Sequence, residues 1–324
     1  MELRWGARTH RGRVRPLNED ALLTAAPAFV VADGMGGHAA GEVASAITVD
    51  CFRQLSGAHR VPAEDVMALL QEANARILDH AASNPDSRGM GTTVTGLVVV
   101  QNGPSEELLA FNVGDSRLYR VRGGSIAQVS VDHSAVQELV DAGVLSPEDT
   151  ATHPDRHVVT RALGADPPPR PDLWFIVPEE GDRFVLCTDG LSGEVTDHDL
   201  AAVATLEEDP QEVARRLIDI ALSAGGRDNI TAVVVDVLRA TGPLDVESTA
   251  PRGGEAARDV ERTNPRDSLP PLEAEVTGDV GLHRVLWSDK EPDQLNGAGH
   301  DPDEPDKARV PSRPGPAHRE APTV

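Results

Sequence analysis

Three aspartates lie at the ends of short apolar runs that are typical of β-strands. The runs and their aspartates are 29–32 with Asp33, 184–187 with Asp189, and 230–238 with Asp228, which precedes its run. Because the end of a strand fixes a side chain at the rim of a sheet, the three carboxylates can converge on one place. A glycine follows each of the first two aspartates and lets backbone carbonyls approach a ligand closely. This arrangement predicts a site for hard divalent cations such as Mg²⁺ or Mn²⁺, which prefer oxygen ligands.

The sequence up to Arg239 alternates between short β-rich runs and longer segments with helical spacing. The predicted strands, bounded by Gly, Asp and Asn, are 28–32, 93–100, 107–113, 117–121, 183–187 and 230–238. The predicted helices are 41–55, 63–83, 135–142 and 211–224. Two helices occur in succession, and several strands follow one another directly. This order favours antiparallel sheets with helices packed outside over a repeating βαβ unit.

Composition excludes several classes of function. The formal net charge is −23, from 53 acidic and 30 basic residues, so binding to nucleic acid or to an anionic membrane is not expected. No apolar run has the length of about 18 residues that predicts a transmembrane helix. The first 15 residues also lack the apolar core of a secretory signal. We therefore predict a soluble, cytoplasmic chain whose Cys51 and Cys187, both in apolar stretches, are reduced and buried.

A change of composition near Arg239 predicts a domain boundary. Residues 1–239 are expected to form one folded domain. Residues 240–324 are rich in Pro, Gly, Asp, Glu and Arg and lack periodicity, which predicts a disordered, acidic, Pro-rich tail. Within the tail, residues 280–287 form the one short apolar island. That island is either a docking motif or chance hydrophobicity.

Each acidic motif is weak when taken singly, because Asp-Gly pairs are common in turns. The complete set is more specific, because its blocks follow one order between residues 5 and 238. These blocks are RPLNED (15–20), VADGMGGH (31–38), GMGTT (89–93), NVGDSR (112–117), DHS (132–134), HPDR (153–156), TRALG (160–164), CTDG (187–190) and RDN (227–229). In these blocks the chain resembles the PP2C (PPM) family of metal-dependent protein serine/threonine phosphatases, in its bacterial branch.

The resemblance implies a fold and an activity. The fold would be of the α+β class: a four-layer αββα sandwich, with two antiparallel β-sheets flanked by helix pairs. The activity would be hydrolysis of phosphoserine and phosphothreonine on proteins by a metal-activated bridging water, in signal transduction that opposes bacterial Ser/Thr kinases. The implied partners are phosphorylated proteins, including Ser/Thr kinases, and the chain is expected to act as a monomer.

The resemblance also implies which residues bind two Mn²⁺ or Mg²⁺ ions. Asp33 would bridge both ions, the Gly34 carbonyl would ligate one of them, and Asp189 and Asp228 would complete the protein ligands of the first. Arg15 would bind the substrate phosphate, because a guanidinium offers a planar fork of donors to phosphate oxygens. The implied catalytic residues are thus Arg15 and the three aspartates.

For the other residues of these blocks, the sequence leaves two possible roles open. Glu19 and Asp20 would reach the second ion, directly or through water, or they belong to a solvated turn. Asp115 would create a third, weaker metal site, or it is a turn aspartate between two strands. Asn229 would orient a metal-bound water or cap the adjoining turn.

Two positions depart from the family pattern. Met35 stands where many eukaryotic relatives have a histidine that is proposed to protonate the leaving oxygen, and a thioether cannot donate a proton. His38, His133 and His153 are candidate acids, although a structural role is expected more often for such histidines. His157 stands where relatives often have Asn, in residues 132–164, which resemble the flap beside the active site.

Two other functions are alternatives to an active protein phosphatase that opposes bacterial Ser/Thr kinases. A phosphatase of a sigma-factor regulatory switch usually lacks the 15–20 block and the flap signature that occur here. A phosphoprotein-binding pseudophosphatase would have lost metal-binding carboxylates, whereas Asp33, Asp189 and Asp228 are all present. Both are therefore placed behind the active protein phosphatase.

Overall fold

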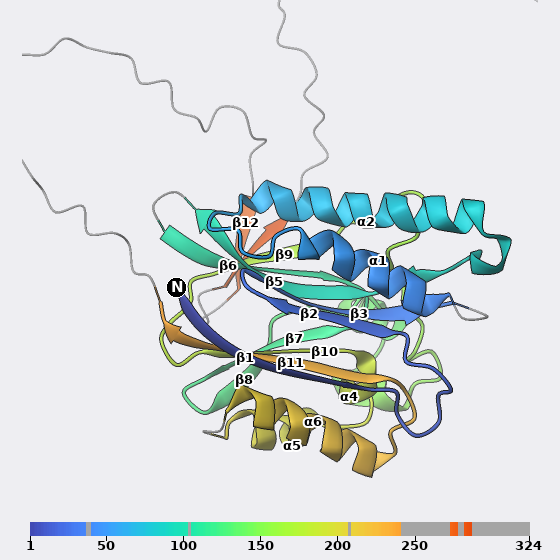
Figure 1. Ribbon diagram of the computed structural model, residues 1–324. Helices are drawn as coiled ribbons and strands as arrows, with labels where there is room; N and C mark the ends of the chain where they lie inside the picture. Colours follow the sequence, from blue (N-terminus) through green and yellow to red (C-terminus); the bar gives the residue numbers. More distant parts are fainter. Residues whose placement is uncertain (37–39, 103–104, 207–208, 241–272, 278–281, 287–324) are drawn as a thin grey trace, which may run out of the picture. The chain divides into compact units, whose positions relative to one another are not determined.

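Two antiparallel sheets pack face to face, with helices on both outer sides (Figure 1). The computed structural model describes residues 1–36, 40–102, 105–206, 209–240, 273–277 and 282–286. All of them belong to one compact unit, Met1–Ser288. The described residues form the four-layer αββα sandwich of the α+β class, which confirms the fold class predicted from the sequence.

The first sheet has five strands in the order β1-β11-β10-β7-β8, and each strand is antiparallel to its neighbours. Its strands are β1 Glu2–His10, β11 Ile230–Arg239, β10 Arg183–Cys187, β7 Arg117–Arg122 and β8 Ser125–Gln128. The two strands at its centre, β10 and β11, are the ones whose ends carry Asp189 and Asp228. The first sheet therefore supplies two of the three predicted carboxylates.

The second sheet has the order β12-β13-β9-β6-β5-β3-β2, and the short strand β4 also pairs with β3. Its strands are β2 Asp20–Ala25, β3 Ala28–Met35, β4 Gly91–Thr92, β5 Val94–Asn102, β6 Ser105–Val113, β9 Asp172–Ile176, β12 Glu273–Thr277 and β13 Leu282–Leu286. Asp20 lies directly opposite Asp33 in the β2–β3 register. This sheet supplies Asp33 at the end of a strand that is buried on both faces.

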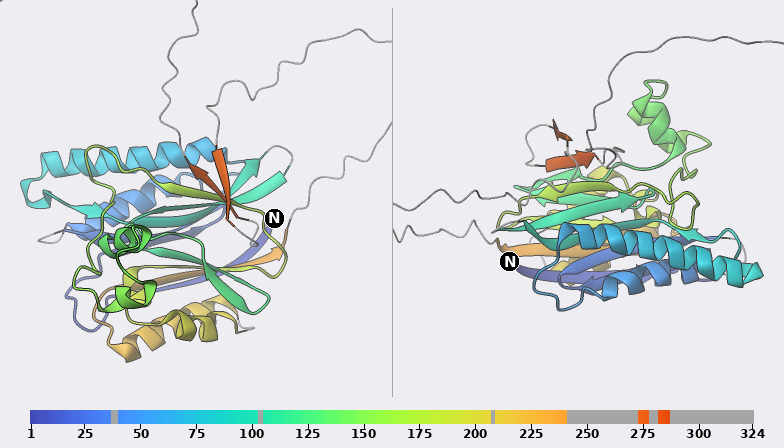
Figure 2. Two further views of the ribbon diagram at one scale, coloured as in Figure 1. Left: turned by 180° about the vertical axis from the view of Figure 1, so that it is seen from behind. Right: turned by 90° about the horizontal axis from the view of Figure 1, so that it is seen from above.

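Helix pairs cover the outer faces of both sheets. The helices are α1 Gly41–Arg53, α2 Ala63–Ser83, α3 Ala135–Asp141, α4 Asp189–Ser192, α5 Asp197–Ala204 and α6 Pro210–Ala224, with 3-10 turns at Pro85–Ser87 and Pro147–Thr152. Helices α1 and α2 lie on the second sheet, and α5 and α6 lie on the first (Figure 1). The segment that carries α3 stands out from the sandwich in the right-hand view of Figure 2. Within the described residues, none of these helices combines the length and the apolar character needed to cross a membrane.

The alternation of apolar side chains along the strands builds three separate cores, one for each interface between layers. On β3, Phe29 and Val31 pack between the two sheets, whereas Val30 and Ala32 face α1 and α2. On β11, every second residue likewise packs between the two sheets, and the residues that alternate with them pack against α6. Strands that are buried on both faces read as continuous apolar runs, which is why both were recognised in the sequence.

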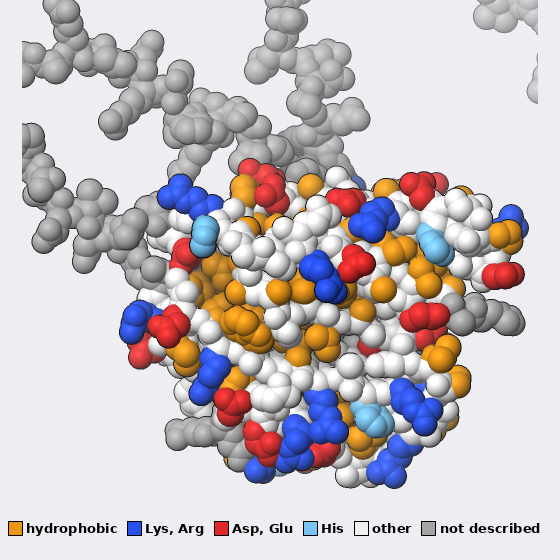
Figure 3. Space-filling model, viewed as in Figure 1, with side chains coloured by type: hydrophobic (Ala, Val, Ile, Leu, Met, Phe, Trp, Pro, Cys, Tyr) orange, Lys and Arg blue, Asp and Glu red, His pale blue; other side chains and the backbone are white. Residues whose placement is uncertain are grey.

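The surface in Figure 3 shows hydrophobic side chains gathered where the edge strands β1 and β2 reach the surface, with charged side chains of both signs around them. Trp5 of β1 is 38% exposed and packs edge to face on Phe29, with ring centroids 5.3 Å apart. The cysteines Cys51 and Cys187 are both free and buried, as predicted from their apolar surroundings.

Two strands lie in the segment for which the sequence predicted no strand. β12 and β13 form an antiparallel pair, and β13 lies antiparallel to β9, with Leu282 opposite Ile176 and Val285 opposite Leu173. β13 falls within the apolar island 280–287, whose residues suit a strand. The strands β12 and β13 thus differ from the prediction of a tail without structure. The rest of residues 241–324 lies outside the described residues, so the predicted boundary at Arg239 and the predicted disorder stay predictions.

Candidate functional site

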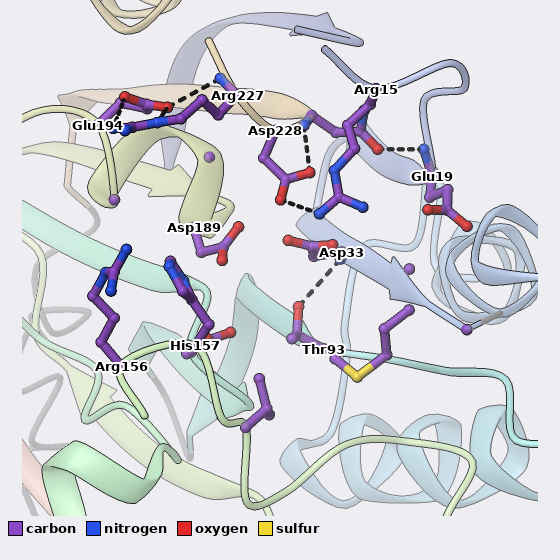
Figure 4. Close-up of a pocket in the computed structure, with 18 of the residues that line it drawn as sticks. Arg15, Glu19, Asp33, Thr93, Arg156, His157, Asp189, Glu194, Arg227 and Asp228 are labelled. Atoms are coloured by element: carbon purple, nitrogen blue, oxygen red, sulfur yellow. Dashed lines mark hydrogen bonds and ion pairs between the residues drawn. The ribbon is translucent and has the colours of Figure 1, made fainter. Parts of the chain in front are cut away.

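A cleft of about 670 Å³ opens at the ends of β3 in the second sheet and of β10 and β11 in the first (Figure 4). Acidic residues from separate elements line it: Asp33 at the end of β3, Asp189 at the start of α4, and Asp228 before β11. Glu19 and Asp115 also line the cleft, from the loop before β2 and the turn between β6 and β7. The structure therefore brings together carboxylates that lie up to 209 positions apart in sequence, counting from Glu19 to Asp228.

The backbone at Asp33 is fixed by hydrogen bonds to β4 and its neighbours. The Asp33 amide donates to Thr93 Oγ1 at 3.1 Å, and the Asp33 carbonyl accepts from the Thr93 amide at 2.9 Å. The next residue, Gly34, can only be glycine, since a Cβ there would lie 2.1 Å from the Gly41 oxygen and 2.6 Å from the Glu19 oxygen. The Asp33-Gly34 pair is thus held at a point where neighbouring backbone leaves no room for a side chain.

Burial, and then repulsion among neighbouring carboxylates, raises the pKa values of the aspartates in the cleft. Burial and the charges of Asp20, Asp189 and Asp115 hold the pKa of Asp33 well above its usual range. Burial and the charges of Asp189 and Asp132 raise the pKa of Asp115 to about 8. In this arrangement Asp33 shares a hydrogen bond with Asp189, whose own pKa is raised by burial and by the charge of Asp228. Without a bound cation, burial and mutual repulsion therefore favour the protonated forms of these carboxylates.

Asp20 lies behind the cleft and is absent from the residues that line it. Its Oδ2 accepts hydrogen bonds from Thr188 at 2.9 Å and Thr231 at 2.6 Å, so it ties β2 to the first sheet. Its Oδ1 is buried without a hydrogen-bond partner among the described residues. Burial raises the pKa of Asp20 to about 7, with the charges of Asp189 and Asp228 adding to the effect. A buried carboxylate oxygen without a partner is costly unless a cation or water meets it.

Arg15 and Asn229 organise the entrance to the cleft. Arg15 Nη2 donates to Asp228 Oδ2 at 2.6 Å, and the Arg15 side chain is about half exposed. The side-chain Nδ2 of Asn229 donates to the carbonyls of Arg11 and Leu17, at 2.9 and 2.8 Å. Its side-chain Oδ1 accepts from the Glu19 backbone amide at 2.7 Å. Asn229 therefore fastens the loop that carries Arg15 and Glu19.

Residues from the flap form the wall opposite the aspartates. Arg156 and His157 line the cleft, and the His157 ring lies beside Asp189 in Figure 4. Of the candidate acids, His133 and His153 do not line the cleft, and His38 lies outside the described residues. The Met35 side chain lines the cleft and offers no proton.

The sequence reasoning missed the ion pair between Glu194 and Arg227. The Glu194 side chain is 5% exposed, and its Oε1 accepts from the Arg227 amide at 3.0 Å and from Arg227 Nε at 2.8 Å. This pair fixes the backbone immediately before Asp228, and it lowers the pKa of Glu194 through the hydrogen bond to Arg227. No signal in the sequence joins two residues that lie 33 positions apart.

The oxygen donors around the cleft are of the kind that a divalent cation binds. In the described part of the chain, no three Asp, Glu, His or Cys side chains already surround a single point as metal ligands. The chemistry of the set nevertheless fits hard cations, which prefer carboxylate and carbonyl oxygens. The pKa of Asp33 is raised and Asp20 Oδ1 has no hydrogen-bond partner among the described residues, so a bound cation would favour the ionised form of both groups.

Comparisons with known proteins agree with this geometry. Residues 9–229 match the family model described as Protein phosphatase 2C. The serine/threonine protein phosphatase PstP of Mycobacterium tuberculosis is 40% identical over 242 residues, which cover 74% of this chain and 46% of PstP. The chain thus spans about half the length of that relative. The serine/threonine phosphatase stp of Listeria innocua is 36% identical over 243 residues, which cover 71% of this chain and 94% of stp.

Solved structures give the same result. The crystal structure of Mycobacterium tuberculosis PstP/Ppp has a TM-score of 0.69 and 38% identity, and the match covers 73% of this chain and 99% of the other. A second structure, of the PstP catalytic domain in complex with two manganese ions, has a TM-score of 0.67 with the same identity and coverage. With a family model that spans most of the folded residues and relatives at this identity, the chain belongs to the protein phosphatase 2C family.

Proposed function

We propose that this chain hydrolyses phosphoserine and phosphothreonine esters on proteins, with two Mn²⁺ or Mg²⁺ ions. The observation that carries the proposal is the convergence of Asp33, Asp189 and Asp228 in one cleft with Arg15 at its entrance. The names of the relatives, serine/threonine protein phosphatases, support the same activity.

The residues that would hold the ions are the side chains of Asp33, Asp189 and Asp228 and the carbonyl of Gly34. Glu19 would contribute from the adjoining wall. Asp20 would act from behind it, where its Oδ1 has no partner among the described residues. Asp115 would hold a third, weaker ion. Bound divalent cations activate a water molecule for attack on phosphorus and offset negative charge on the phosphate oxygens.

The chain's own residues would bind and orient the phosphate. The Arg15 guanidinium makes one described hydrogen bond, to Asp228, so its other N–H groups can meet phosphate oxygens. The guanidinium would follow the charge that grows on those oxygens during displacement. Asn229 would keep Arg15 in place through its bonds to the Arg11 and Leu17 carbonyls.

The competing functions have weaker support. A pseudophosphatase would be expected to lack part of the acidic set, whereas the cleft retains every predicted carboxylate except Asp20, which lies directly behind it. A phosphatase of a sigma-factor switch would usually lack the loop that carries Arg15 and the flap residues Arg156 and His157, and both line this cleft.

We further propose that the substrates are phosphoproteins that include Ser/Thr kinases, and that the chain acts as a monomer in the cytoplasm. Two buried, unpaired cysteines suit a reducing compartment. Light scattering after size exclusion would measure the mass in solution, and a dimeric mass would contradict the monomer.

A phosphopeptide assay tests the proposed activity. We expect hydrolysis with Mn²⁺, none after chelation, and a fall of at least about a hundredfold in Asp33→Asn or Asp189→Asn, because the attacking water depends on the cations. Asp219→Asn, on the exposed surface of α6, is the matched control and should keep full activity. Undiminished turnover in the two cleft variants would refute the proposal.

A further inference from the structure

His133 lies where three segments of the fold meet, and it takes no direct part in the cleft. Its side chain is buried, with 5% of the residue exposed. It touches the turn between β6 and β7, the end of the flap and the first residue of β9. The arrangement differs from that of a proton donor, because the ring lies outside the cleft lining.

The first contact fixes the turn that carries Asp115. The Gly114 amide donates to His133 Nδ1 at 3.1 Å, and the His133 amide donates to the Gly114 carbonyl at 2.9 Å. Gly114 has a φ of +111°, and a Cβ there would lie 2.6 Å from the Thr93 side chain. A turn with so little freedom takes its position from the groups bonded to it, and His133 provides two of those bonds.

The second set of contacts fixes the root of the flap. The His133 carbonyl accepts from the Thr160 amide at 2.8 Å, and Ser134 pairs with Val159 as an isolated bridge. His133 Nε2 lies 3.1 Å from Arg161 Nη1 and 3.5 Å from Asp172 Oδ2. The two ends of the flap therefore close on His133, and Asp172 joins them to β9.

The two ring nitrogens have different surroundings. Nδ1 accepts from the Gly114 amide, whereas Nε2 lies between a donor, Arg161 Nη1 at 3.1 Å, and an acceptor, Asp172 Oδ2 at 3.5 Å. Each ring nitrogen thus serves a different segment. Nδ1 holds the turn, and Nε2 faces the flap root.

We propose that His133 is a positioning residue that joins the Asp115 turn to the root of the flap. Through it, the acidic wall at Asp115 and the flap wall at Arg156 and His157 keep one relative position across the cleft. The consequence for turnover rests on the proposed phosphatase function. The mechanical link itself does not, and amide exchange can test it without any substrate.

Two substitutions at His133 distinguish its contact with the Asp115 turn from its contacts with the root of the flap. The amide oxygen of Asn can replace Nδ1, whereas the amide nitrogen of Gln can replace Nε2. In the full chain with Mn²⁺, His133→Asn should leave exchange in residues 112–118 near wild type and speed exchange in residues 135–160. His133→Gln should do the reverse. We expect about tenfold faster exchange in the affected segment, the change that loss of one buried hydrogen bond would cause.

The two substitutions should also differ in their effects on phosphopeptide hydrolysis. His133→Asn should mainly raise KM for a phosphopeptide, because it loosens the flap, whereas His133→Gln should mainly lower kcat, because it loosens the acidic wall. His153→Asn is the matched control, since His153 Nδ1 accepts only from the nearby Asp155 amide at 3.2 Å. It should change neither exchange nor kinetics.

Some results would overturn the link. Equal acceleration of both segments by both substitutions would indicate general loosening, and wild-type exchange in both would indicate no role. If the two variants fail to fold, Asp172→Asn replaces them, because it removes the charge that faces both His133 Nε2 and Arg161 and leaves the Gly114 bond. Asp172→Asn should speed exchange in the flap alone, and an unchanged flap would equally overturn the link. If no hydrolysis is detected in any variant, the exchange result still stands, so the two proposals fail separately.

Discussion

At the scale of single residues, the cleft is dominated by carboxylates that repel one another. The pKa values of Asp20, at about 7, and Asp115, at about 8, show that both are stable in their protonated forms when only the protein's own groups surround them. A sequence can indicate that such residues exist at strand ends. It cannot give their separation or protonation, which depend on how two sheets pack.

These pKa values predict how stability depends on pH without cations. Both groups have a folded-state pKa above the ordinary value of 3.8, so the folded protein binds more protons than the unfolded chain between about pH 4 and 8. Stability should therefore fall as pH rises through that window. Thermal unfolding of the chelator-treated protein should show Tm decreasing from pH 5 to pH 8.5, with a smaller decrease when Mn²⁺ is present. A Tm that rises over this range would contradict the assignment.

Removing one of these charges should stabilise the cation-free protein. Asp115→Asn should raise Tm at pH 8.5 by at least about 3 °C, which corresponds to roughly 1 kcal/mol for a domain of this size. At pH 5 the gain should nearly vanish, because Asp115 is already protonated. Asp219→Asn on the surface of α6 serves as the control: it removes partly exposed ion pairs with Arg8 and Arg215, so its effect on Tm should be small and the same at both pH values.

Gly34 gives a steric prediction. A methyl group at this position would lie 2.1 Å from the Gly41 oxygen, so Gly34→Ala must displace the backbone beside Asp33. We expect a loss of stability of about 1–3 kcal/mol, typical of overpacking, together with loss of Mn²⁺ binding. Gly57→Ala is the control for backbone strain alone, because its φ of +77° disfavours alanine while a Cβ there meets nothing within 4 Å; it should lose stability but keep Mn²⁺ binding. Near-normal Mn²⁺ binding in Gly34→Ala would show that the constraint at this point is unimportant.

At the scale of elements, the strands recognised in the sequence were those buried on both faces, such as β3 and β11. The first strand, β1, was missed because its residues ELRWGARTH are mostly polar and only Gly6 is fully buried. Its position comes from pairing with β11 and from close packing on α6, where a Cβ at Gly6 would lie 2.2 Å from Gln211. Such long-range contacts leave no local pattern in the sequence.

The pairing of β13 with β9 predicts that residues 282–286 protect a sheet edge. Deleting residues 241–324 should speed amide exchange in Asp172–Ile176, because the edge of β9 loses its partner. The substitution Arg284→Pro should have the same effect, since proline cannot donate to the ladder. Deleting only residues 287–324 is the control and should leave β9 unchanged. If amide exchange in β9 is as slow in the 241–324 deletion and in Arg284→Pro as in the control deletion, β13 does not protect β9 in solution.

At the scale of the whole molecule, the sequence predicted the layers and most of the cleft. Asp33, Asp189 and Asp228 gather as expected, with Arg15 beside them. Three features could not be predicted: the position of Asp20 behind the cleft, the Glu194–Arg227 pair, and the central place of His133. Each depends on contacts between segments that are distant in sequence and that meet only when the two sheets pack together.

The central claim is that the aspartates of the cleft bind divalent cations. Calorimetric titration of the cation-free full chain with Mn²⁺ tests it most directly, because binding is measured without any substrate. We expect two ions in the wild-type protein, the loss of at least one in Asp33→Asn, and unchanged binding in Asp219→Asn. Absence of Mn²⁺ binding in the wild-type protein, or the same binding in Asp33→Asn, would contradict the claim.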